Sequence, residues 1–444
     1  MKEFDVVIVG GGVAARNSVK MLNQLNPQLK TAVIRDQKAT VNPCSIPYAL
    51  GGELTIEEIF ESDERITMWN AELIIDKATS IDPKGKVVHT ENGDDYKYSK
   101  LLLYPGAVPV RPPIPGVELE NVHVLRNTAD VYAVEDALKK SKKVVIVGGG
   151  YIGAEVGVLI RKRNIEVTIV EMLPHCLMAT LDPDFCEIVE EEMQKKGVTL
   201  FTNTKVTAIK GNGKVESVEI GDKELPADLV VLSVGVRPDT ALAESAGMAL
   251  GKTGILVDNR MRTSIPDIFA AGDVVETYCF VTGKIKPAKI GNNAAVESKV
   301  AVMNALGHDR IFEGIIGPSA TKIGDLSIGM VGVGEGQAAR DGVDVFTGNS
   351  ETTNMYKSIH GTKKTLVRLY FKKQDNTIVG GQIIGSEFIG AQVDLIAEAI
   401  RCHLRLEDII TMHYTVQPVL TPEPARNGII LAAEDAWLKT RKGL

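Results

Sequence analysis

The chain has 444 residues, 44% of them hydrophobic, which is enough for roughly two to four domains with buried cores. Its net charge of −7 is spread along the sequence without a basic block, which argues against a nucleic-acid partner. No apolar run reaches the roughly 18 residues that span a membrane, and a strand pattern begins almost at once, so we expect neither a membrane segment nor a signal peptide.

The first predicted unit places a glycine-rich turn directly after a buried strand. The apolar run 6–9 leads into Gly10-Gly11-Gly12-Val13-Ala14-Ala15, a helix follows through Leu25, and a second strand covers 31–34. Such a turn brings backbone N–H groups and a helix N-terminus close to a pyrophosphate. We therefore predict a dinucleotide site at this turn.

The second strand of this unit ends in Ile34-Arg35-Asp36. An arginine therefore stands where this fold usually carries the acid that binds a ribose. Asp36 can take the ribose after a shift of one residue. Arg35 is then either a solvated side chain or a phosphate contact, and the sequence leaves both possibilities open.

Cys44 lies in Asn42-Pro43-Cys44-Ser45-Ile46-Pro47-Tyr48. The five cysteines form no CxxC pair and suit neither zinc nor a disulfide framework, so we expect a reducing, cytoplasmic location. Free cysteines are usually small buried residues, which suits Cys186, Cys279 and Cys402. A loop flanked by prolines is not a core position, so Cys44 differs. Beside a helix N-terminus and a flavin ring, its thiol would be held as the thiolate.

Proline-dense sequence at 111–116 marks a domain boundary, because it is stiff and cannot continue a sheet. The apolar run 144–147 then leads into a second turn, Gly148-Gly149-Gly150-Tyr151-Ile152-Gly153. The next strand ends at Glu171, whose carboxylate can accept both ribose hydroxyls of NAD and would repel the extra phosphate of NADP. Two such turns in one chain are typical of proteins that pass electrons between two dinucleotides.

Later segments add strands and one acidic candidate. A buried strand is predicted in 228–235, and Ile268-Phe269-Ala270-Ala271-Gly272-Asp273 is another apolar strand meeting a glycine and an acid. Ligands sit at the carboxyl ends of strands in open α/β sheets, so we expect Asp273 to bind a cofactor rather than cap a helix. From about Ile316 the sequence changes to strands such as 365–371 and a helix at about 393–400.

Five motifs in this order resemble the flavin-dependent pyridine nucleotide–disulfide oxidoreductases over essentially the whole chain. They are the two glycine turns, Gly235-Val236-Arg237-Pro238-Asp239, the segment 263–273, and Gly380-Gly381-Gln382-Ile383-Ile384-Gly385. The resemblance implies an α/β fold with two Rossmann-like dinucleotide-binding domains and a C-terminal α+β dimerisation domain. The implied ranges are 1–112 and 241–315 for FAD, 113–240 for NAD, and 316–444 for dimerisation.

Within that family the chain looks like the branch with one redox cysteine, which Cys44 matches. This branch includes coenzyme A disulfide reductases, NAD(P)H sulfur and persulfide reductases, and NADH oxidases and peroxidases. The resemblance implies FAD in the first site and NADH in the second. The residues expected at FAD are Gly10, Gly12, Ala15, Asp36, Ala78, Ala107, Asp273 and Ala294. Those expected at NAD are Gly148, Gly150, Tyr151, Ile152, Gly153, Glu155, Glu171 and Gly235.

Departures from the family pattern bear on the substrate. Val13 replaces a histidine that peroxidases and many oxidases of this branch carry, which counts against peroxide or oxygen. The first helix has Met21-Leu22-Asn23-Gln24 where coenzyme A disulfide reductases carry cations, so only Arg16 and Lys20 remain for coenzyme A phosphates. Tyr104-Pro105-Gly106 replaces the usual Ala-Thr-Gly, and no rhodanese segment is found.

The expected activity is NADH-dependent reduction of a sulfur–sulfur bond in coenzyme A disulfide, a small persulfide, polysulfide or elemental sulfur. An alternative is an NADH oxidase that reduces oxygen through a cysteine sulfenic acid. Another is a redox-responsive regulatory protein that binds FAD and NAD. The expected partners are a small sulfur-containing substrate and a second copy in a homodimer with a shared active site, with no nucleic acid or membrane. By resemblance, Tyr356, His413 and Tyr414 would reach Cys44 of the partner subunit as general acids.

Overall fold

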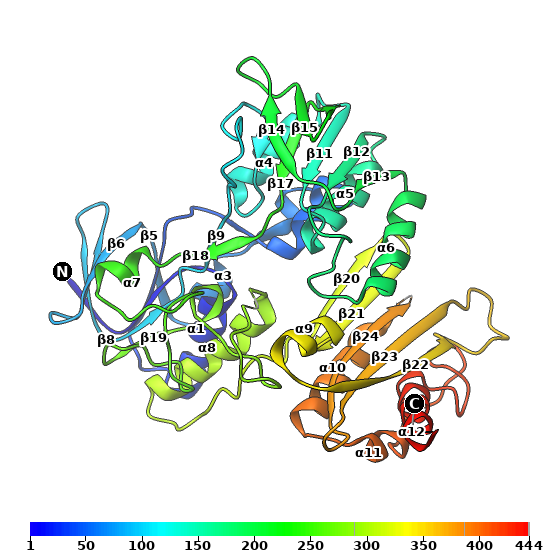
Figure 1. Ribbon diagram of the computed structural model, residues 1–444. Coiled ribbons are helices and arrows are strands. Elements are labelled where there is room, and N and C mark those ends of the chain that lie inside the picture. The colour runs from blue at the N-terminus through cyan, green and yellow to red at the C-terminus, as the bar shows by residue number, and fades with distance from the viewer. Residues whose placement is uncertain (288, 386, 443–444) are drawn as a thin grey trace.

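A mostly parallel sheet and an entirely parallel sheet carry the two glycine turns, and an antiparallel sheet follows them. The computed structural model describes residues 1–287, 289–385 and 387–442. Figure 1 shows the three sheets as three neighbouring bodies: the first in blue with a green to yellow-green segment from later in the chain, the middle one in cyan and green, and the C-terminal one in yellow to red. We call them the first, second and C-terminal bodies.

The first sheet is mostly parallel and is buried on both faces. In spatial order its strands are β5 (Ala71–Ile75), β2 (Thr31–Arg35), β1 (Lys2–Val9), β8 (Asp95–Leu103), β7 (Val87–Thr90) and β6 (Ala78–Asp82), with β19 (Ile268–Ala270) beside β8. Val6 and Ile8 pack on the face covered by α1 (Val13–Leu25) and α8 (Gly291–Ala305). Val7 and Val9 join the core on the other face. Burial on both faces explains the unbroken apolar run.

The pairing of β19 with β8 returns the chain to the first sheet after it has formed the second. Ile268 lies opposite Leu101, and Ala270 opposite Leu103. This places Asp273, in η3 (Gly272–Val274), at the same sheet edge as the first glycine turn. The short elements of this body are β3 (Thr40–Val41), η1 (Pro43–Ser45), α2 (Ile46–Leu50), η2 (Glu57–Ile59), β4 (Phe60–Glu61), α3 (Glu64–Thr67) and α7 (Ala241–Ser245).

The second sheet is entirely parallel. Its spatial order is β10 (Val122–His123), β17 (Leu229–Leu232), β11 (Lys143–Val147), β12 (Glu166–Val170) and β13 (Val198–Phe201). Its helices are α4 (Thr128–Leu138), α5 (Tyr151–Arg161) and α6 (Pro183–Lys195), and a small antiparallel sheet contains β14 (Val206–Lys210), β15 (Ser217–Ile220) and β16 (Lys223–Pro226). A two-stranded ribbon, β9 (Ala107–Pro109) with β18 (Val236–Pro238), connects this body to the first.

The chain leaves the first sheet for this ribbon directly after β8. Strand β8 ends at Leu103, and Ala107 starts the separate strand β9. Pro105 lacks an N–H and Gly106 has a φ of +81°, so the chain turns out of the first sheet between them.

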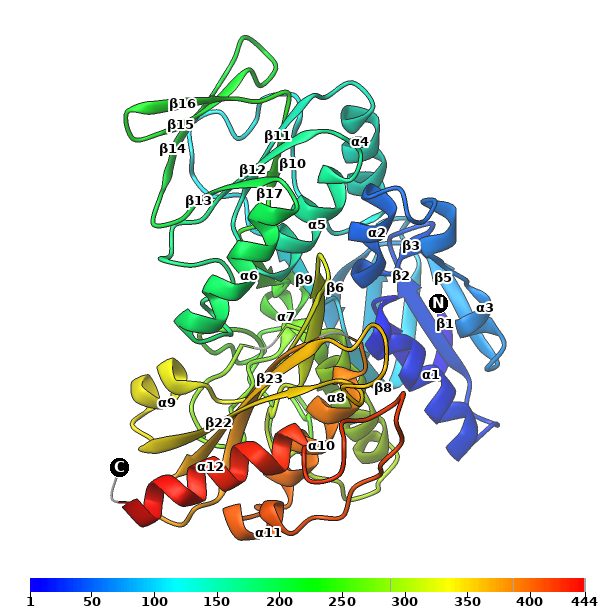
Figure 2. The same ribbon diagram turned by 90° about the vertical axis from the view of Figure 1, so that its right-hand side faces the viewer.

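The C-terminal sheet is antiparallel, in the order β20 (Ser319–Ile323), β21 (Leu326–Gly332), β24 (Ile378–Gly385), β23 (Lys364–Lys372) and β22 (Val345–Thr353). Helices α10 (Ile389–Arg401) and α12 (Gly428–Lys442) pack on it, with α11 (Leu406–Ile410) beside α12 and α9 (Glu335–Asp341) at the end of β21. Figure 2 shows α10 and α12 below this sheet and the second body above it. No helix within the described ranges is both long and apolar enough to cross a membrane.

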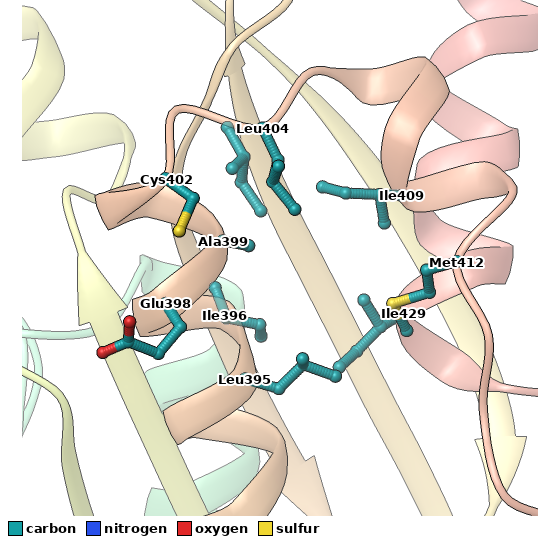
Figure 3. Close-up of a pocket in the computed structure, with 10 residues that line it drawn as sticks. Leu395, Ile396, Glu398, Ala399, Cys402, Leu404, Ile409, Met412 and Ile429 are labelled. Carbon is teal, nitrogen blue, oxygen red and sulfur yellow. The ribbon is translucent and has the colours of Figure 1, made fainter.

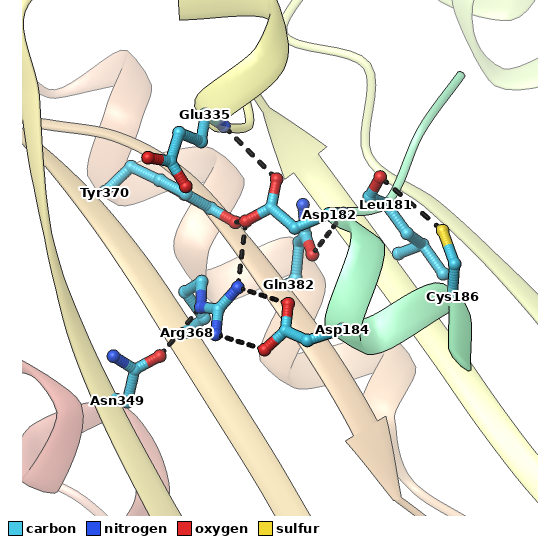
Figure 4. A network of polar contacts seen from close by, with 9 residues as sticks. All are labelled: Leu181, Asp182, Asp184, Cys186, Glu335, Asn349, Arg368, Tyr370 and Gln382. Atoms are coloured by element: carbon cyan, nitrogen blue, oxygen red, sulfur yellow. Dashed lines mark hydrogen bonds and ion pairs between the residues drawn. The ribbon is translucent and has the colours of Figure 1, made fainter. Parts of the chain in front are cut away.

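A buried polar network fixes the second body on the C-terminal sheet (Figure 4). Asp182, at the start of α6, accepts hydrogen bonds from the Tyr370 hydroxyl and from Nη1 of Arg368 at 3.0 Å. Arg368 also forms a paired contact with Asp184, at 2.9 and 2.7 Å, and its guanidinium lies 4.7 Å from the ring centre of Phe185. Two strongly bound carboxylates therefore hold the N-terminus of α6 against β23.

Candidate active site and dinucleotide sites

The first glycine turn has the shape of a phosphate cradle. Gly10 has a φ of +118°, and a Cβ there would lie 2.1 Å from the Tyr104 carbonyl oxygen, so only glycine fits. Gly12 begins α1 without a side-chain cap, no acidic residue stands in the first turn, and a Cβ at Gly12 would meet nothing within 4 Å. The start of α1 is therefore uncapped and has open space beside Gly12, as a bound pyrophosphate requires.

The second turn repeats this geometry. Gly148 has a φ of +106°, and a Cβ there would lie 2.4 Å from the Ser233 carbonyl oxygen. Gly150 begins α5 uncapped and with open space beside it, and Gly153 lies within the first turns of α5. Gly235 follows β17 at the same sheet edge. Both turns therefore fit a dinucleotide.

Glu171 lies at the end of β12, directly behind the second turn. Its Oε2 accepts the Gly149 N–H at 2.6 Å and its Oε1 accepts the Leu173 N–H at 2.8 Å. The residue is 9% exposed, so these two bonds fix the carboxylate in one orientation. An ionised carboxylate has about four acceptor positions, which leaves capacity for ribose hydroxyls.

Arg35 is not a solvated side chain. It is 5% exposed, and its Nε and Nη2 donate to the carbonyl oxygens of Gln37 and Lys38 at 2.8 and 3.1 Å. Nη2 also pairs with Asp63 at 2.6 Å. These bonds use the guanidinium to brace the loop after β2, so the structure gives no support to a phosphate contact either. Asp36 is exposed, and its carboxylate has no partner among the described residues.

The other residues predicted at FAD border the same sheet edge. Asp273 accepts a hydrogen bond from Nη2 of Arg126 at 2.9 Å. A Cβ on Gly272 would lie 3.2 Å from the Cβ of Ala294, so the start of α8 is packed against η3. Ala15 is buried on α1, Ala107 is buried at the start of β9, and Ala78 opens β6 just after the end of β5.

Cys44 is exposed in η1, and its N–H donates to Oδ1 of Asn42 at 3.1 Å. The helix that follows, α2, packs on α5 of the second body, so the thiol stands between the two dinucleotide bodies. Atoms around the thiol reduce its hydration, and this effect, with the negative charge of Glu155, raises the pKa of Cys44. These two effects disfavour the expected thiolate in the chain by itself. Stabilisation of the thiolate is left to a bound flavin.

Two residues predicted at NAD bond through their side chains to the C-terminal sheet. The Tyr151 hydroxyl lies 3.2 Å from Oγ of Ser319, and the Glu155 carboxylate accepts a hydrogen bond from the Thr321 hydroxyl. Both partners belong to β20, so these side chains join α5 to the C-terminal sheet. Burial raises the pKa of both Tyr151 and Glu155. Ile152 lies on the exposed side of the helix, 40% exposed.

Sequence reasoning missed Tyr48, which stands one helical turn after Cys44. Burial raises the pKa of its hydroxyl, and the charges of Glu155, Glu53 and Cys44 raise it further. The i, i+4 spacing from Cys44 across a short helix is the signal that could have identified it. Tyr48 is thus a proton donor candidate within the same chain as Cys44.

Tyr356, His413 and Tyr414 gather on two adjacent exposed loops of the C-terminal body. The Tyr356 N–H donates to the Pro418 carbonyl at 3.0 Å, and the Tyr414 hydroxyl accepts the Ala425 N–H at 2.9 Å. His413 is exposed. Within the described part of the chain, no hydrogen bond or ion pair joins any of the three to Cys44.

An apolar cavity of about 180 Å³ lies between α10, α11 and the start of α12 (Figure 3). Leu395, Cys402 and Met412 are among the residues that line it. Cys402 is exposed, so the expectation that it is a buried apolar residue is wrong: it follows the last turn of α10 at the surface. Cys186 and Cys279 are buried as expected.

Comparisons with known proteins agree with this architecture. The model of the family described as pyridine nucleotide-disulphide oxidoreductase matches residues 4–295, and the model of its dimerisation domain matches residues 318–427. The chain therefore belongs to the pyridine nucleotide-disulphide oxidoreductase family, and the resemblance drawn from the five motifs is confirmed. It is an oxidoreductase of the class that uses FAD and a nicotinamide dinucleotide.

Individual relatives span almost the whole chain. An NADH oxidase of Methanocaldococcus jannaschii is 31% identical, covering 98% of each chain. A CoA-dependent NAD(P)H sulfur oxidoreductase of Pyrococcus furiosus is 30% identical, covering 95% of this chain and 97% of its own. The solved structure of an NAD-dependent persulfide reductase from A. fulgidus has a TM-score of 0.93 at 28% identity, covering 99% of this chain and 84% of that one.

Proposed function

We propose that this chain is an NADH-dependent flavoprotein reductase of sulfur–sulfur bonds that works through Cys44. The observation that carries the proposal is the position of an exposed thiol on η1, between the body with the first phosphate cradle and helix α5 of the second. The similarity to a persulfide reductase and a sulfur oxidoreductase supports it.

Each element has a defined task in this proposal. Bound FAD would accept a hydride from NADH and pass on its electron pair. The uncapped starts of α1 and α5 hold the two pyrophosphates, and Asp273 and Glu171 hold hydroxyl groups of the two cofactors. The Cys44 thiolate attacks one sulfur of the substrate, forming a mixed disulfide and releasing the other sulfur as a thiolate. The electron pair that FAD would supply then cleaves the S–S bond of the mixed disulfide, which regenerates the Cys44 thiolate and releases the remaining sulfur fragment as a second thiolate.

The structure favours a small sulfur substrate over coenzyme A disulfide. Of the two cations left on α1, Arg16 is paired with Glu61 at 3.4 Å, whereas Lys20 is exposed, 5.9 Å from the ring centre of Trp69. A single exposed lysine holds the phosphates of coenzyme A only weakly. We therefore infer that persulfides and polysulfide are reduced with a higher kcat/KM than coenzyme A disulfide.

We also propose a homodimer in which each active site draws on both copies. The loop that carries Tyr414, which is 39% exposed, also exposes Val416, Val419 and Leu420. Such a cluster of exposed apolar side chains is typical of a surface that a partner covers. In a dimer this loop would bring Tyr356, His413 and Tyr414 to Cys44 of the partner subunit, where one of them protonates the leaving thiolate.

Mixed dimers test the shared site. One chain carries Cys44→Ser, and the other carries Tyr414→Phe with His413→Ala. If the site is shared, each mixed dimer has one site with both changes and one with neither, so about half of the wild-type activity returns. Failure to recover activity, with loss of activity in Tyr48→Phe, would instead place the proton donor in the same chain as Cys44.

The test of the activity itself is NADH consumption under strict anaerobiosis with polysulfide, a small persulfide or coenzyme A disulfide, and separately with oxygen. Cys44→Ser should abolish turnover of every sulfur substrate while NADH still bleaches the flavin. Cys402→Ser removes another exposed thiol and is the matched control, which should keep full turnover.

A second candidate function is an NADH oxidase, favoured by the 31% identity to the relative of that name. Oxygen consumption that exceeds turnover of every sulfur substrate would establish it. Binding of FAD and NAD without steady-state turnover would indicate the regulatory alternative instead.

A further inference from the structure

Glu297 is a buried acidic residue that none of the roles above uses. It lies on α8 and is 2% exposed, less than any other acidic residue that the structure describes. Its Oε2 accepts the Gly272 N–H at 2.6 Å. Gly272 directly precedes Asp273, and Ala294 stands three residues before Glu297, on the same face of α8. Glu297 therefore bonds to the backbone next to Asp273 and stands one helical turn from Ala294, the two proposed FAD contacts.

The carboxyl group of Glu297 forms no ion pair with any cation among the described residues. Lys289 donates instead to the carbonyl oxygens of Thr253 and Val275, at 3.1 and 3.0 Å. Three other titratable groups influence the Glu297 carboxyl. Asp273 of η3 brings a negative charge and Lys289 a partly compensating positive charge. Tyr104, at the end of β8, is buried, which raises the pKa of its hydroxyl and keeps it neutral. Burying an unpaired carboxylate is costly, so the neutral acid is favoured.

Burial accordingly raises the pKa of Glu297 to about 8, although the Gly272 N–H and the charge of Lys289 act in the opposite direction. Near neutral pH a modest change in the local charge is therefore enough to change its protonation. A charge that appears on the far side of Gly272 and Ala294 would act on the buried Glu297 carboxyl across these two residues.

We propose that Glu297 takes up one proton from solvent when FAD bound against Asp273 and Ala294 is reduced, and releases it on reoxidation. A hydride carries one proton and two electrons, so its transfer from NADH adds one negative charge to the flavin and consumes no solvent proton. The carboxylate of Glu297 then binds one solvent proton, which removes the neighbouring negative charge. The inference rests on the FAD placement proposed above but requires no sulfur chemistry.

The experiment uses flavin-loaded protein carrying Cys44→Ser, so that no thiol step exchanges protons. NADH is added anaerobically in weak buffer, and a pH indicator records proton uptake while absorbance records flavin bleaching. At about pH 6, where Glu297 is already protonated, uptake should be near zero; at about pH 8 it should approach about half a proton per flavin. Adding Glu297→Gln should abolish the uptake at about pH 8 without preventing bleaching.

The control variant is Glu192→Gln, which removes a buried carboxyl group on α6 of the second body and should keep the uptake. If the flavin bleaches completely and the proton uptake is the same with and without the Glu297→Gln substitution, the inference is overturned. The reductase proposal would remain intact. A failure of Cys44→Ser protein to reduce persulfide says nothing against Glu297, so the two proposals fail separately.

A second measurement does not depend on NADH. Because the folded-state pKa of Glu297 is raised, its stabilising contribution is complete below the unfolded-state value of about 4.3 and is lost as the pH rises through about 8. The midpoint of thermal unfolding should therefore fall less between about pH 5 and 8 in Glu297→Gln than in the parent protein. Parallel pH profiles would overturn the raised pKa on which the coupling depends.

Discussion

Replacing Arg368 by methionine should loosen the start of α6 while leaving the bodies folded. The substitution keeps most of the apolar stem that packs near Phe185 but removes three charge-assisted hydrogen bonds to Asp182 and Asp184. Asp182 has a side chain only 5% exposed, so it would be left buried without a cation. Asp184 has a side chain 58% exposed and returns to water at little cost.

The expected loss of free energy follows from the buried position of Asp182. Removing one partner of a buried ion pair costs about 3–5 kcal/mol, and the Tyr370 hydroxyl and Glu335 N–H continue to donate to Asp182, so about 2–4 kcal/mol is expected. If α6 opens locally, this corresponds to roughly 30- to 1,000-fold faster amide hydrogen exchange in its first turns.

Hydrogen exchange detected by mass spectrometry measures the amide exchange rates in peptides that cover 183–195. Asp184→Asn is the matched control, because it removes only the exposed carboxylate and should change exchange by less than about tenfold. Exchange in Arg368→Met within about threefold of wild type would refute the view that Arg368 locks the second body to the C-terminal sheet.

Three further predictions concern the cofactor sites and the thiol. Gly10→Ala should abolish FAD retention on gel filtration, since its Cβ would lie 2.1 Å from a carbonyl oxygen; retention of full flavin content would contradict this. Glu171→Ala should reduce the NADH-over-NADPH preference in flavin bleaching by roughly tenfold or more, and an unchanged ratio would show that this carboxylate does not contact the ribose. Glu155→Gln removes a negative charge that raises the pKa of Cys44, so alkylation of Cys44 at about pH 8 should be roughly two- to threefold faster, and an unchanged rate would refute that electrostatic coupling.

The sequence was sufficient for elements defined by local pattern. Both strand–turn–helix units, the strand at 268–270 and the change to a different strand pattern near 316 rest on apolar runs and glycines that act over short distances. The return of 268–270 to the first sheet is a long-range pairing that only the family resemblance implied. The five motifs also correctly predicted the family and its cofactors, FAD and a nicotinamide dinucleotide.

The orientation of long polar side chains was beyond sequence reasoning. Tyr151 and Glu155 were assigned to the NAD site from the motif, but their side chains bond to β20, which is distant in sequence. Arg35 braces the loop after β2 through carbonyl oxygens that no pattern identifies. The exposure of Cys402 depends on where α10 ends against α11, and periodicity locates helix ends poorly.

The central claim is that the thiolate of Cys44 attacks the sulfur substrate. The most direct test is to mix flavin-loaded enzyme with a small disulfide, anaerobically and without NADH, and to locate the adduct by peptide mass spectrometry. The account predicts a mixed disulfide on the peptide that contains Cys44, released in full by about one equivalent of NADH per adduct. No adduct at Cys44 in an enzyme that still turns over the same disulfide would contradict it.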